Sequence, residues 1–174
     1  MNAVIENIMA RRSCRCFDPE RIPSDEVIAQ IAEAGTWAPT GKGLQKPIII
    51  AVTNRELRDR ISKMNAEIWG KGDADPFYGA PAMLIVLCER WRNDVYDGSC
   101  VMENMMLAAE SLGVNTCWIH RAKEEFESEE GKEILRSLGV EGDYVGIGHV
   151  ALGYAMKPIP APKPRKENYV IWAK

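Results

Sequence analysis

Hydrophobic residues along the chain recur at two spacings, which predict helices that alternate with short strands. Apolar residues three and four positions apart predict amphipathic helices. Ser24 and Asn54 stand where helix N-caps are expected, and Gly35 and Gly113 stand where helices should end. The predicted helices cover residues 2–10, 24–34, 54–68, 97 or 99 to 112, and 128–138.

Short apolar runs predict strands between these helices, and the first two runs are continuous enough to predict buried strands. The runs cover residues 48–52, 83–88, 114–119 and 144–152. Gly146 and Gly148 lie within the last run, which indicates that another backbone approaches this strand closely. A chain of 174 residues fits one domain, which we expect to span residues 1–174.

Two segments carry more apolar surface than one small domain can bury. In the predicted helix that ends at 112, Met102, Met106 and Leu107 widen the apolar stripe, so we expect this helix to be buried, in part at a subunit contact. Residues 154–174 form a proline-rich extended arm, and 168–172 have the composition of a strand. We expect the arm to dock on a partner subunit or on its own domain. The alternative is a disordered tail.

Composition narrows the class of protein. The net charge of -3 argues against a general nucleic-acid-binding protein. No apolar run approaches the roughly 20 residues that cross a bilayer, and residues 1–10 lack the basic start of a signal peptide. Five cysteines, an odd number without regular spacing, fit free thiols in a reducing compartment. We therefore expect a cytoplasmic protein without nucleic-acid or membrane partners.

Basic residues gather at two places along the chain. Residues 11–15 hold three arginines and Ser13, directly after the first predicted helix. Guanidinium groups bind phosphate as planar forks, and a hydroxyl adds a donor, so this cluster suits one anionic group. Lys163 and Arg165 stand two apart in the arm, so both can face the same way in an extended chain. A solvated basic turn is the alternative for residues 11–15.

Other candidate sites carry weaker signals. The loop 37–47 has two glycines, which allow close backbone approach to a ligand, but it lacks the frame of a phosphate-binding P-loop, and a purely structural loop remains open. His120 and His149 are far apart and have no cysteine or carboxylate at metal-ligand spacing. We expect a structural or surface role for both histidines, and no metal site.

Five motifs, in order, resemble those of the nitroreductase family of FMN-dependent oxidoreductases. The first is Arg-Arg-Ser-Cys-Arg-Cys-Phe at 11–17, and the second is Ala-Pro-Thr-Gly-Lys-Gly-Leu-Gln at 38–45. Further matches cover 77–81, 112–119 and 151–154, the last followed by Lys-Pro-Arg at 163–165. Each motif is short, but their order over nearly the whole chain resembles a short member of the family.

The resemblance implies an α+β fold, an α-β-α sandwich with a small central, mostly antiparallel sheet and an extended C-terminal arm. It also implies an intertwined homodimer with FMN at the subunit interface. The implied activity is hydride transfer from NADH or NADPH to a small-molecule acceptor, a nitroaromatic, a quinone or a related compound, by a ping-pong mechanism. Because FMN supplies the redox chemistry, no side chain is expected to act as a catalyst.

The resemblance also assigns the residues that would contact FMN. Arg11, Ser13 and Arg15 match FMN contacts, with Arg12 between them, and Arg15 is the candidate for a positive charge near flavin N1 and O2. Lys163 and Arg165 match a pair that grips the phosphate. Pro39, Thr40 and Gly41 match a loop that the partner subunit brings to the flavin ring. The list is completed by Trp118, Ile119 and His120, a strand end whose backbone at Ile119 and His120 approaches flavin N5, and by Asn65, which matches a contact to the pyrimidine edge.

The chain departs from the family pattern near the expected flavin pocket. Gly43, counted among the FMN-binding residues, stands where many members have asparagine, and Lys46-Pro47 replaces a Pro-Trp pair. The span 70–79 is short, so the substrate lid of larger members is reduced. Both departures bear on the identity of the substrate.

Two other functions remain open from the sequence. One is a flavin-binding protein that sequesters or senses FMN without NAD(P)H turnover. The other is a thiol redox protein that uses Cys14 and Cys16. A Cys-x-Cys pair in an extended segment points its sulfur atoms to opposite faces, which disfavours the second.

Overall fold

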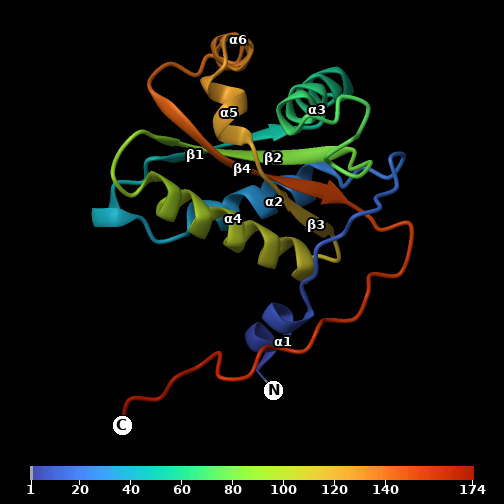
Figure 1. The fold of residues 1–174 in the computed structure, drawn as a ribbon, viewed down its shortest axis with the longest axis vertical. Helices are drawn as coiled ribbons and strands as arrows, with labels where there is room; N and C mark the ends of the chain where they lie inside the picture. The colour runs from blue at the N-terminus through green and yellow to red at the C-terminus, as the bar shows by residue number, and fades with distance from the viewer. Residues whose placement is uncertain (1) are drawn as a thin grey trace.

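The structure is a computed structural model that describes residues 2–174; Met1 lies outside the described residues. Its strands form the middle of three layers (Figure 1), with α2 and α4 on one face of the sheet and α3, α5 and α6 on the other. This arrangement confirms the predicted α-β-α fold. The elements are α1 (Ala3–Ala10), α2 (Asp25–Thr36), the 3-10 turn η1 (Gly41–Gly43), β1 (Pro47–Val52), α3 (Arg55–Trp69), β2 (Ala82–Glu89), α4 (Asp94–Ser111), β3 (Asn115–Ile119), α5 (Ala122–Glu127), α6 (Glu129–Ser137) and β4 (Tyr144–Gly153).

The sheet has the strand order β1-β2-β4-β3, and each neighbouring pair is antiparallel. Ile85 in the central strand β2 pairs with Ile50 of β1 on one side and with His149 of β4 on the other. β1 is an edge strand, and most of its residues are only half-buried. The prediction that 48–52 is a buried strand is therefore wrong in its burial, because an apolar run does not distinguish an edge strand from a central one.

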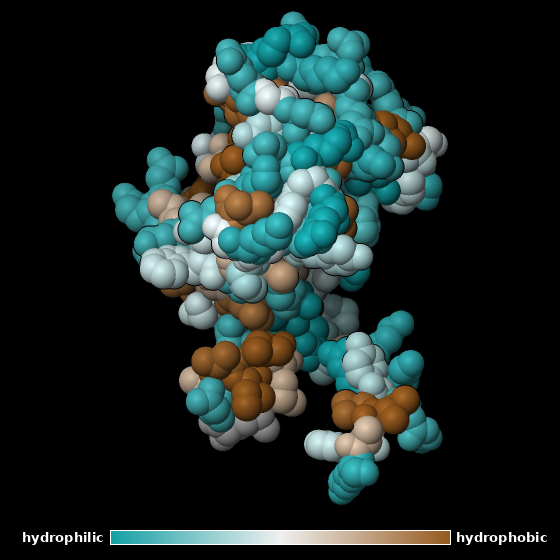
Figure 2. Space-filling view, turned by 90° about the vertical axis from the view of Figure 1, so that its left-hand side faces the viewer, coloured by the Kyte–Doolittle hydropathy of each residue, from teal (hydrophilic) through white to brown (hydrophobic). Residues whose placement is uncertain are grey.

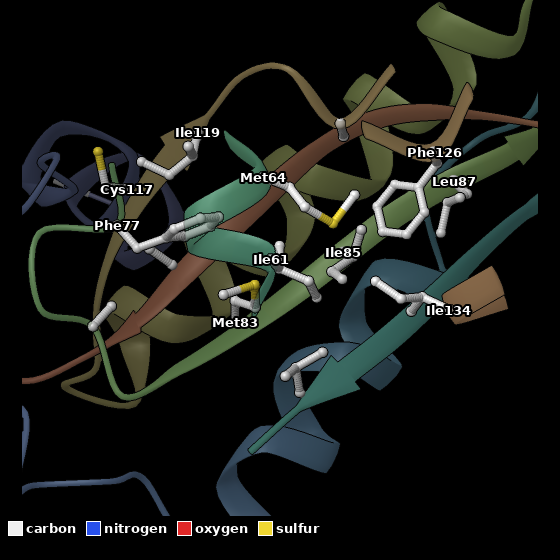
Figure 3. Packing of buried hydrophobic residues seen from close by; sticks show 14 of the residues in the cluster. Ile61, Met64, Phe77, Met83, Ile85, Leu87, Cys117, Ile119, Phe126 and Ile134 are labelled. Atoms are coloured by element: carbon white, nitrogen blue, oxygen red, sulfur yellow. The ribbon is translucent and has the colours of Figure 1, made fainter. Parts of the chain in front are cut away.

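The two faces of β2 supply two separate hydrophobic cores. Met83, Ile85 and Leu87 point into the core beneath α3, α5 and α6, which Figure 3 shows from close by. Leu84 and Val86 point into the second core, against α2 and α4. Successive residues of a strand face opposite ways, so this one strand anchors both helical layers to the sheet.

Two glycines let neighbouring elements approach closely. A Cβ atom at Gly35 would lie 2.7 Å from Cγ of Met105, and α2 runs on past this glycine to Thr36. The predicted helix end at Gly35 is therefore wrong, because this glycine serves helix packing. A Cβ atom at Gly146 would overlap the carbonyl oxygen of Ala122, which confirms the predicted close approach to β4.

Two helices near the expected site differ from the prediction. α4 begins at Asp94, ahead of the expected start at 97 or 99, so Asp97 lies within the helix and is not its cap. α5 was not predicted, because its six residues are too few for a helical period to appear. It packs against β4 and α6, and such packing is what stabilises short helices in proteins.

α1 and the C-terminal arm project from the layered body of the molecule (Figure 1), and hydrophobic side chains gather on both (Figure 2). The side-chain amide of Asn7 donates a hydrogen bond of 2.8 Å to the Leu107 carbonyl, which ties α1 to α4. The arm forms no strand at 168–172, so that part of the prediction is wrong for this chain, whereas docking of the arm on a partner stays a prediction. The exposed apolar residues of both segments are Val4, Ile5, Ile8, Met9, Tyr169, Val170, Ile171 and Trp172.

Candidate functional site

The arginine cluster is fixed in place by backbone pairing on both sides of the chain. After α1, the Cys14 amide donates a hydrogen bond of 2.8 Å to the carbonyl of Thr116 in β3. Two residues later, the Met156 amide donates a bond of 3.0 Å to the Cys16 carbonyl. Residues 13–16 therefore lie between the start of β3 and the start of the C-terminal arm. These three segments are far apart along the chain and become neighbours only in the folded structure.

A hollow of about 270 Å³ opens beside this cluster, lined by residues 13–16 and 157–160. Arg11 and Arg12 are half-buried, and Arg15 is exposed. Within residues 2–174, none of these arginines has a carboxylate oxygen within 4.0 Å. Nε of Arg12 is buried and has no hydrogen-bond acceptor there. Of the three arginines, Arg15 lines the hollow. Unopposed guanidinium groups at such a place fit an anionic cofactor such as FMN, which would offset their charge.

Lys163 and Arg165, the second predicted phosphate pair, lie exposed on the arm. The arm runs at the same end of the molecule as α1 (Figure 1). Within the described chain neither residue forms an ion pair. Their predicted contact with phosphate stays a prediction.

The strand end that follows β3 is held from inside by Asn65. The Asn65 side chain is fully buried; its Nδ2 donates a hydrogen bond of 2.8 Å to the His120 carbonyl, and its Oδ1 accepts one of 2.8 Å from Nε of Arg121. Arg121 adopts a left-handed backbone conformation, with φ of 80°, which is uncommon for a residue other than glycine. Both ends of the Asn65 amide are thus already bonded within the chain, and its predicted contact with a flavin pyrimidine edge stays a prediction.

Ile119 and Trp118 of β3 have different surroundings. Ile119 is buried in the core beneath α3 and α5, and its carbonyl oxygen lies 3.4 Å from Nδ1 of His149. Trp118 is half-buried on the opposite face of the sheet, and its indole N–H has no hydrogen-bond acceptor within the described chain. His120 is exposed at the strand end. The three predicted residues therefore form one short segment that ends at the surface.

The loop 39–45 is anchored to α4 by a hydrogen bond and lies away from the arginine cluster (Figure 1). Its Gly41 amide donates a hydrogen bond of 2.9 Å to the buried carboxylate of Asp97 in α4. The backbone φ is positive at Lys42, Gly43 and Gln45, so the loop holds a specific shape. In Figure 1 the loop lies beside the start of β1, which is at the opposite edge of the sheet from β3, and it lies away from α1. One chain therefore does not bring Pro39, Thr40, Gly41 and Gly43 together with the arginines.

The match to a family model decides the identity of this fold. The model of the nitroreductase family matches residues 8–154. The chain belongs to the nitroreductase family.

Other nitroreductases resemble the chain over its whole length. An FMN-bound nitroreductase from Bacteroides fragilis has 33% sequence identity and a TM-score of 0.88, with 100% of each chain covered. An FMN-bound nitroreductase from Desulfitobacterium hafniense has 28% identity and the same TM-score of 0.88, again with 100% of each chain covered. A relative from Archaeoglobus fulgidus, provisionally named NADH dehydrogenase/NAD(P)H nitroreductase, is 30% identical over 97% of this chain and 91% of its own.

The remaining candidate groups of this chain are one histidine and three cysteines that are buried in its interior. His149 is fully buried, and its Nε2 lies 2.7 Å from Oε2 of Glu125, which is buried as well. These surroundings fit the structural role expected for His149, which stays a prediction. Burial raises the pKa of the Cys14 and Cys117 thiols, and burial with the nearby charge of Asp97 raises the pKa of Cys88 to about 11. A thiol with a raised pKa is a poor nucleophile, so these cysteines do not support a thiol redox function.

Two other classes of site are also absent from residues 2–174. No group of three or more histidine, cysteine, aspartate or glutamate residues is arranged there to hold a metal ion. Of the helices in the same range, none has both the length and the apolar sequence that crossing a bilayer requires.

Two residues near the site were not predicted from the sequence: Asp97 as the anchor of the loop 39–45, and Arg121 as a residue with a left-handed backbone. In the sequence, Asp97 looks like a possible helix N-cap and Arg121 like an ordinary basic residue, so neither position indicated its role.

Proposed function

We propose that this chain is an FMN-dependent oxidoreductase. NADH or NADPH gives up a hydride and leaves as NAD⁺ or NADP⁺, and a small acceptor such as a nitroaromatic or a quinone then receives two electrons together with protons. The two half-reactions share one site, in a ping-pong mechanism. The observation that carries the proposal is the unopposed cluster of Arg11, Arg12 and Arg15, with Ser13, beside a hollow in the described chain. FMN is bound in the similar nitroreductases from Bacteroides fragilis and Desulfitobacterium hafniense.

The residues of this chain bind and orient the cofactor. Arg11, Ser13 and Arg15 supply donors from the segment after α1, and Lys163 and Arg165 add charge from the arm to the phosphate. When bound, FMN supplies the two-electron redox chemistry. The backbone at Ile119 and His120 lines the reactive edge, and the Asn65 bond to the His120 carbonyl fixes that backbone. A backbone held in advance stabilises developing charge without reorganising during the reaction.

We also propose a homodimer that completes this site. The loop 39–45 lies away from the arginine cluster of its own chain, so Pro39, Thr40, Gly41 and Gly43 would serve the site of the partner subunit. The exposed apolar residues of α1 and the arm supply the surface for such a contact (Figure 2). Obligate interfaces often bury about 2,000 Å² or more. The five free thiols fit the reducing cytoplasm as the location.

Sedimentation of the purified protein tests the dimer. We expect a dimer at micromolar concentration, and truncation after Lys166 should weaken it, because residues 169–172 are then lost while the basic pair is retained. A full-length chain that sediments as a stable, folded monomer would overturn the dimer.

Anaerobic titration of the FMN-loaded protein with NADH and with NADPH tests the activity. Either nucleotide should bleach the visible absorbance of the flavin, and a quinone or nitroaromatic should restore it. Bound flavin that neither nucleotide bleaches would favour the alternative, a protein that sequesters or senses FMN.

A further inference from the structure

Two positive charges share one indole ring near the end of β3. Nζ of Lys71 lies 4.4 Å from the centroid of the Trp69 ring, and Cζ of Arg121 lies 5.0 Å from the same centroid. The electron-rich face of an indole attracts cations, so the Trp69 ring is in contact with both charges. The indole itself is 40% exposed, which places this group at the surface of the molecule.

Neither charge is neutralised within the described chain. Between residues 2 and 174, no carboxylate oxygen lies within 4.0 Å of Lys71 or Arg121, whereas the nearby Lys63 has Glu67 at 3.9 Å. Two like charges near one ring repel each other, and an anion bound beside this group would offset that repulsion. Two basic residues that are free in solvent can move apart and need no anion. Lys71 and Arg121, in contrast, both contact Trp69, and Arg121 is also bonded to Asn65.

The geometry of Arg121 is set by its neighbours and carries backbone strain. Its φ of 80° is in the left-handed region, which costs free energy for a side chain other than glycine. Its Nε is held by Oδ1 of the buried Asn65 at 2.8 Å, so the terminal nitrogens of the guanidinium group are directed by a fixed partner. Strained residues of this kind persist where the surrounding structure fixes them, and they cluster at ligand sites.

The position of this group relates it to the reaction. Asn65 bonds to the His120 carbonyl and to Arg121 at once, so one side chain connects Arg121 to the strand end. In the proposed function the backbone of Ile119 and His120 lines the edge where hydride is exchanged. Lys71 and Arg121 therefore lie beside the place where a second substrate would stack.

We propose that Lys71 and Arg121, held on Trp69, form an anion-binding rim that recognises a carboxylate or phosphate group on the molecule that exchanges hydride at this edge. The inference rests on the proposed function and names a substrate class for it. The anion belongs either to the acceptor, as a carboxylate, or to the nicotinamide nucleotide, as a phosphate. Guanidinium and ammonium groups bind both kinds of oxyanion.

Equilibrium binding to the oxidised, FMN-loaded protein tests the rim with two pairs of probes. One pair is 4-nitrobenzoate and the neutral 4-nitrobenzyl alcohol; the other is NADP⁺ and NAD⁺, which differ by one phosphate. Calorimetry gives the Kd of each without turnover. Arg121→Gln and Lys71→Gln should each raise the Kd of the more anionic member of a pair about tenfold, which corresponds to about 1.4 kcal/mol. The Kd of the less charged member should change less than about twofold.

Control variants separate charge recognition from folding. Lys132→Gln removes one positive charge on α6, where Lys132 pairs with Glu129 at 2.9 Å, and should leave each Kd unchanged. Arg121→Lys keeps the charge and should keep most of the preference for the anion. Lys71 is exposed, so Lys71→Gln tests the rim even if Arg121→Gln fails to fold.

The outcomes distinguish the possible sources of the anion. A change confined to 4-nitrobenzoate assigns the rim to the acceptor, a change confined to NADP⁺ assigns it to the donor, and a change in both indicates a shared site. Unchanged Kd values in an FMN-loaded protein that NADH or NADPH reduces would overturn the rim alone. A protein that binds no FMN would overturn the proposed function and the rim with it.

Discussion

The buried amide of Asn65 donates a hydrogen bond of 2.8 Å to the carbonyl oxygen of His120, and this bond joins α3 to the end of β3. The same amide accepts a bond from Arg121, so one side chain fixes a turn of two residues. Asn65 therefore acts as a positioning residue for the strand end, and a contact to flavin would have to be made without giving up either bond.

Replacing Asn65 with alanine should destabilise the fold. The variant would lose the bonds to the His120 carbonyl and to Arg121, and each hydrogen bond contributes roughly 0.5–1.5 kcal/mol. Urea unfolding measures this cost, and FMN titration of the same variant measures affinity. Asn104→Ala is the matched control, because its amide donates a longer bond of 3.2 Å to a carbonyl on α2 and is only half-buried. Lost FMN affinity at unchanged stability would show instead that Asn65 is a ligand.

Gly35→Ala should destabilise the packing of α2 on α4. The added methyl group would lie 2.7 Å from Cγ of Met105 and 2.9 Å from Cδ1 of Ile49, so one of these side chains must move. Overpacking of this kind costs about 1–3 kcal/mol of unfolding free energy. Gly72→Ala is the control, because nothing lies within 4 Å of a Cβ at that position. Equal melting temperatures for the two variants would contradict the packing role of Gly35.

Asp75 makes the stability of the fold dependent on acid pH. Burial alone would raise the pKa of Asp75, but Arg58, the Ser62 hydroxyl and the Gly79 amide hold it below its ordinary value of 3.8. A lowered pKa in the folded state stabilises the fold above the unfolded-state pKa, and this contribution is lost as the pH falls through the folded-state pKa.

Asp75→Asn should remove that dependence. The variant should be less stable than the parent at neutral pH, and its unfolding free energy should fall less steeply below about pH 4. Unfolding curves in urea at several pH values measure the slope. Asp73→Asn, an exposed neighbour in the same loop, should keep the parent slope. Identical slopes for the parent and Asp75→Asn would refute the contribution.

Much of the fold followed from local signals in the sequence. Asn54 was predicted as an N-cap, and its Oδ1 accepts a bond of 2.9 Å from the Leu57 amide. The Ser24 hydroxyl caps α2 in the same way, at 3.4 Å from the Val27 amide. Such signals depend only on residues a few positions apart, so the sequence displays them directly.

The site could be predicted less completely, because its decisive contacts are long-range. Asp97 was expected at a helix start, whereas its carboxylate binds Gly41, 56 positions away. Gly35 was expected to end a helix, whereas it lies within α2 and packs against Met105. The sequence alone does not distinguish a glycine needed for packing from one that ends a helix. Arg121 follows β3 as an ordinary basic residue, and its hydrogen bond to Asn65 joins residues 56 positions apart.

The predicted phosphate contact of the arm is tested by Arg165→Ala. Charge-assisted hydrogen bonds contribute roughly 1.5–3 kcal/mol, so FMN affinity should fall about ten- to a hundredfold. Turnover at saturating FMN should change little, because the phosphate lies far from the reactive edge of the cofactor. Lys166→Ala, one position along the extended arm, is the matched control. Full affinity in Arg165→Ala, or lost turnover at full occupancy, would contradict the assignment.

The central claim is that the unopposed arginines at 11, 12 and 15 hold FMN in a redox-active site. The most direct measurement is an anaerobic absorbance titration of the purified protein, first with FMN and then with NADH or NADPH. We expect tight, non-covalent binding of FMN, bleaching by a nicotinamide nucleotide, and recovery of the colour when a quinone or nitroaromatic is added. A colourless protein that remains free of flavin in excess FMN would contradict it.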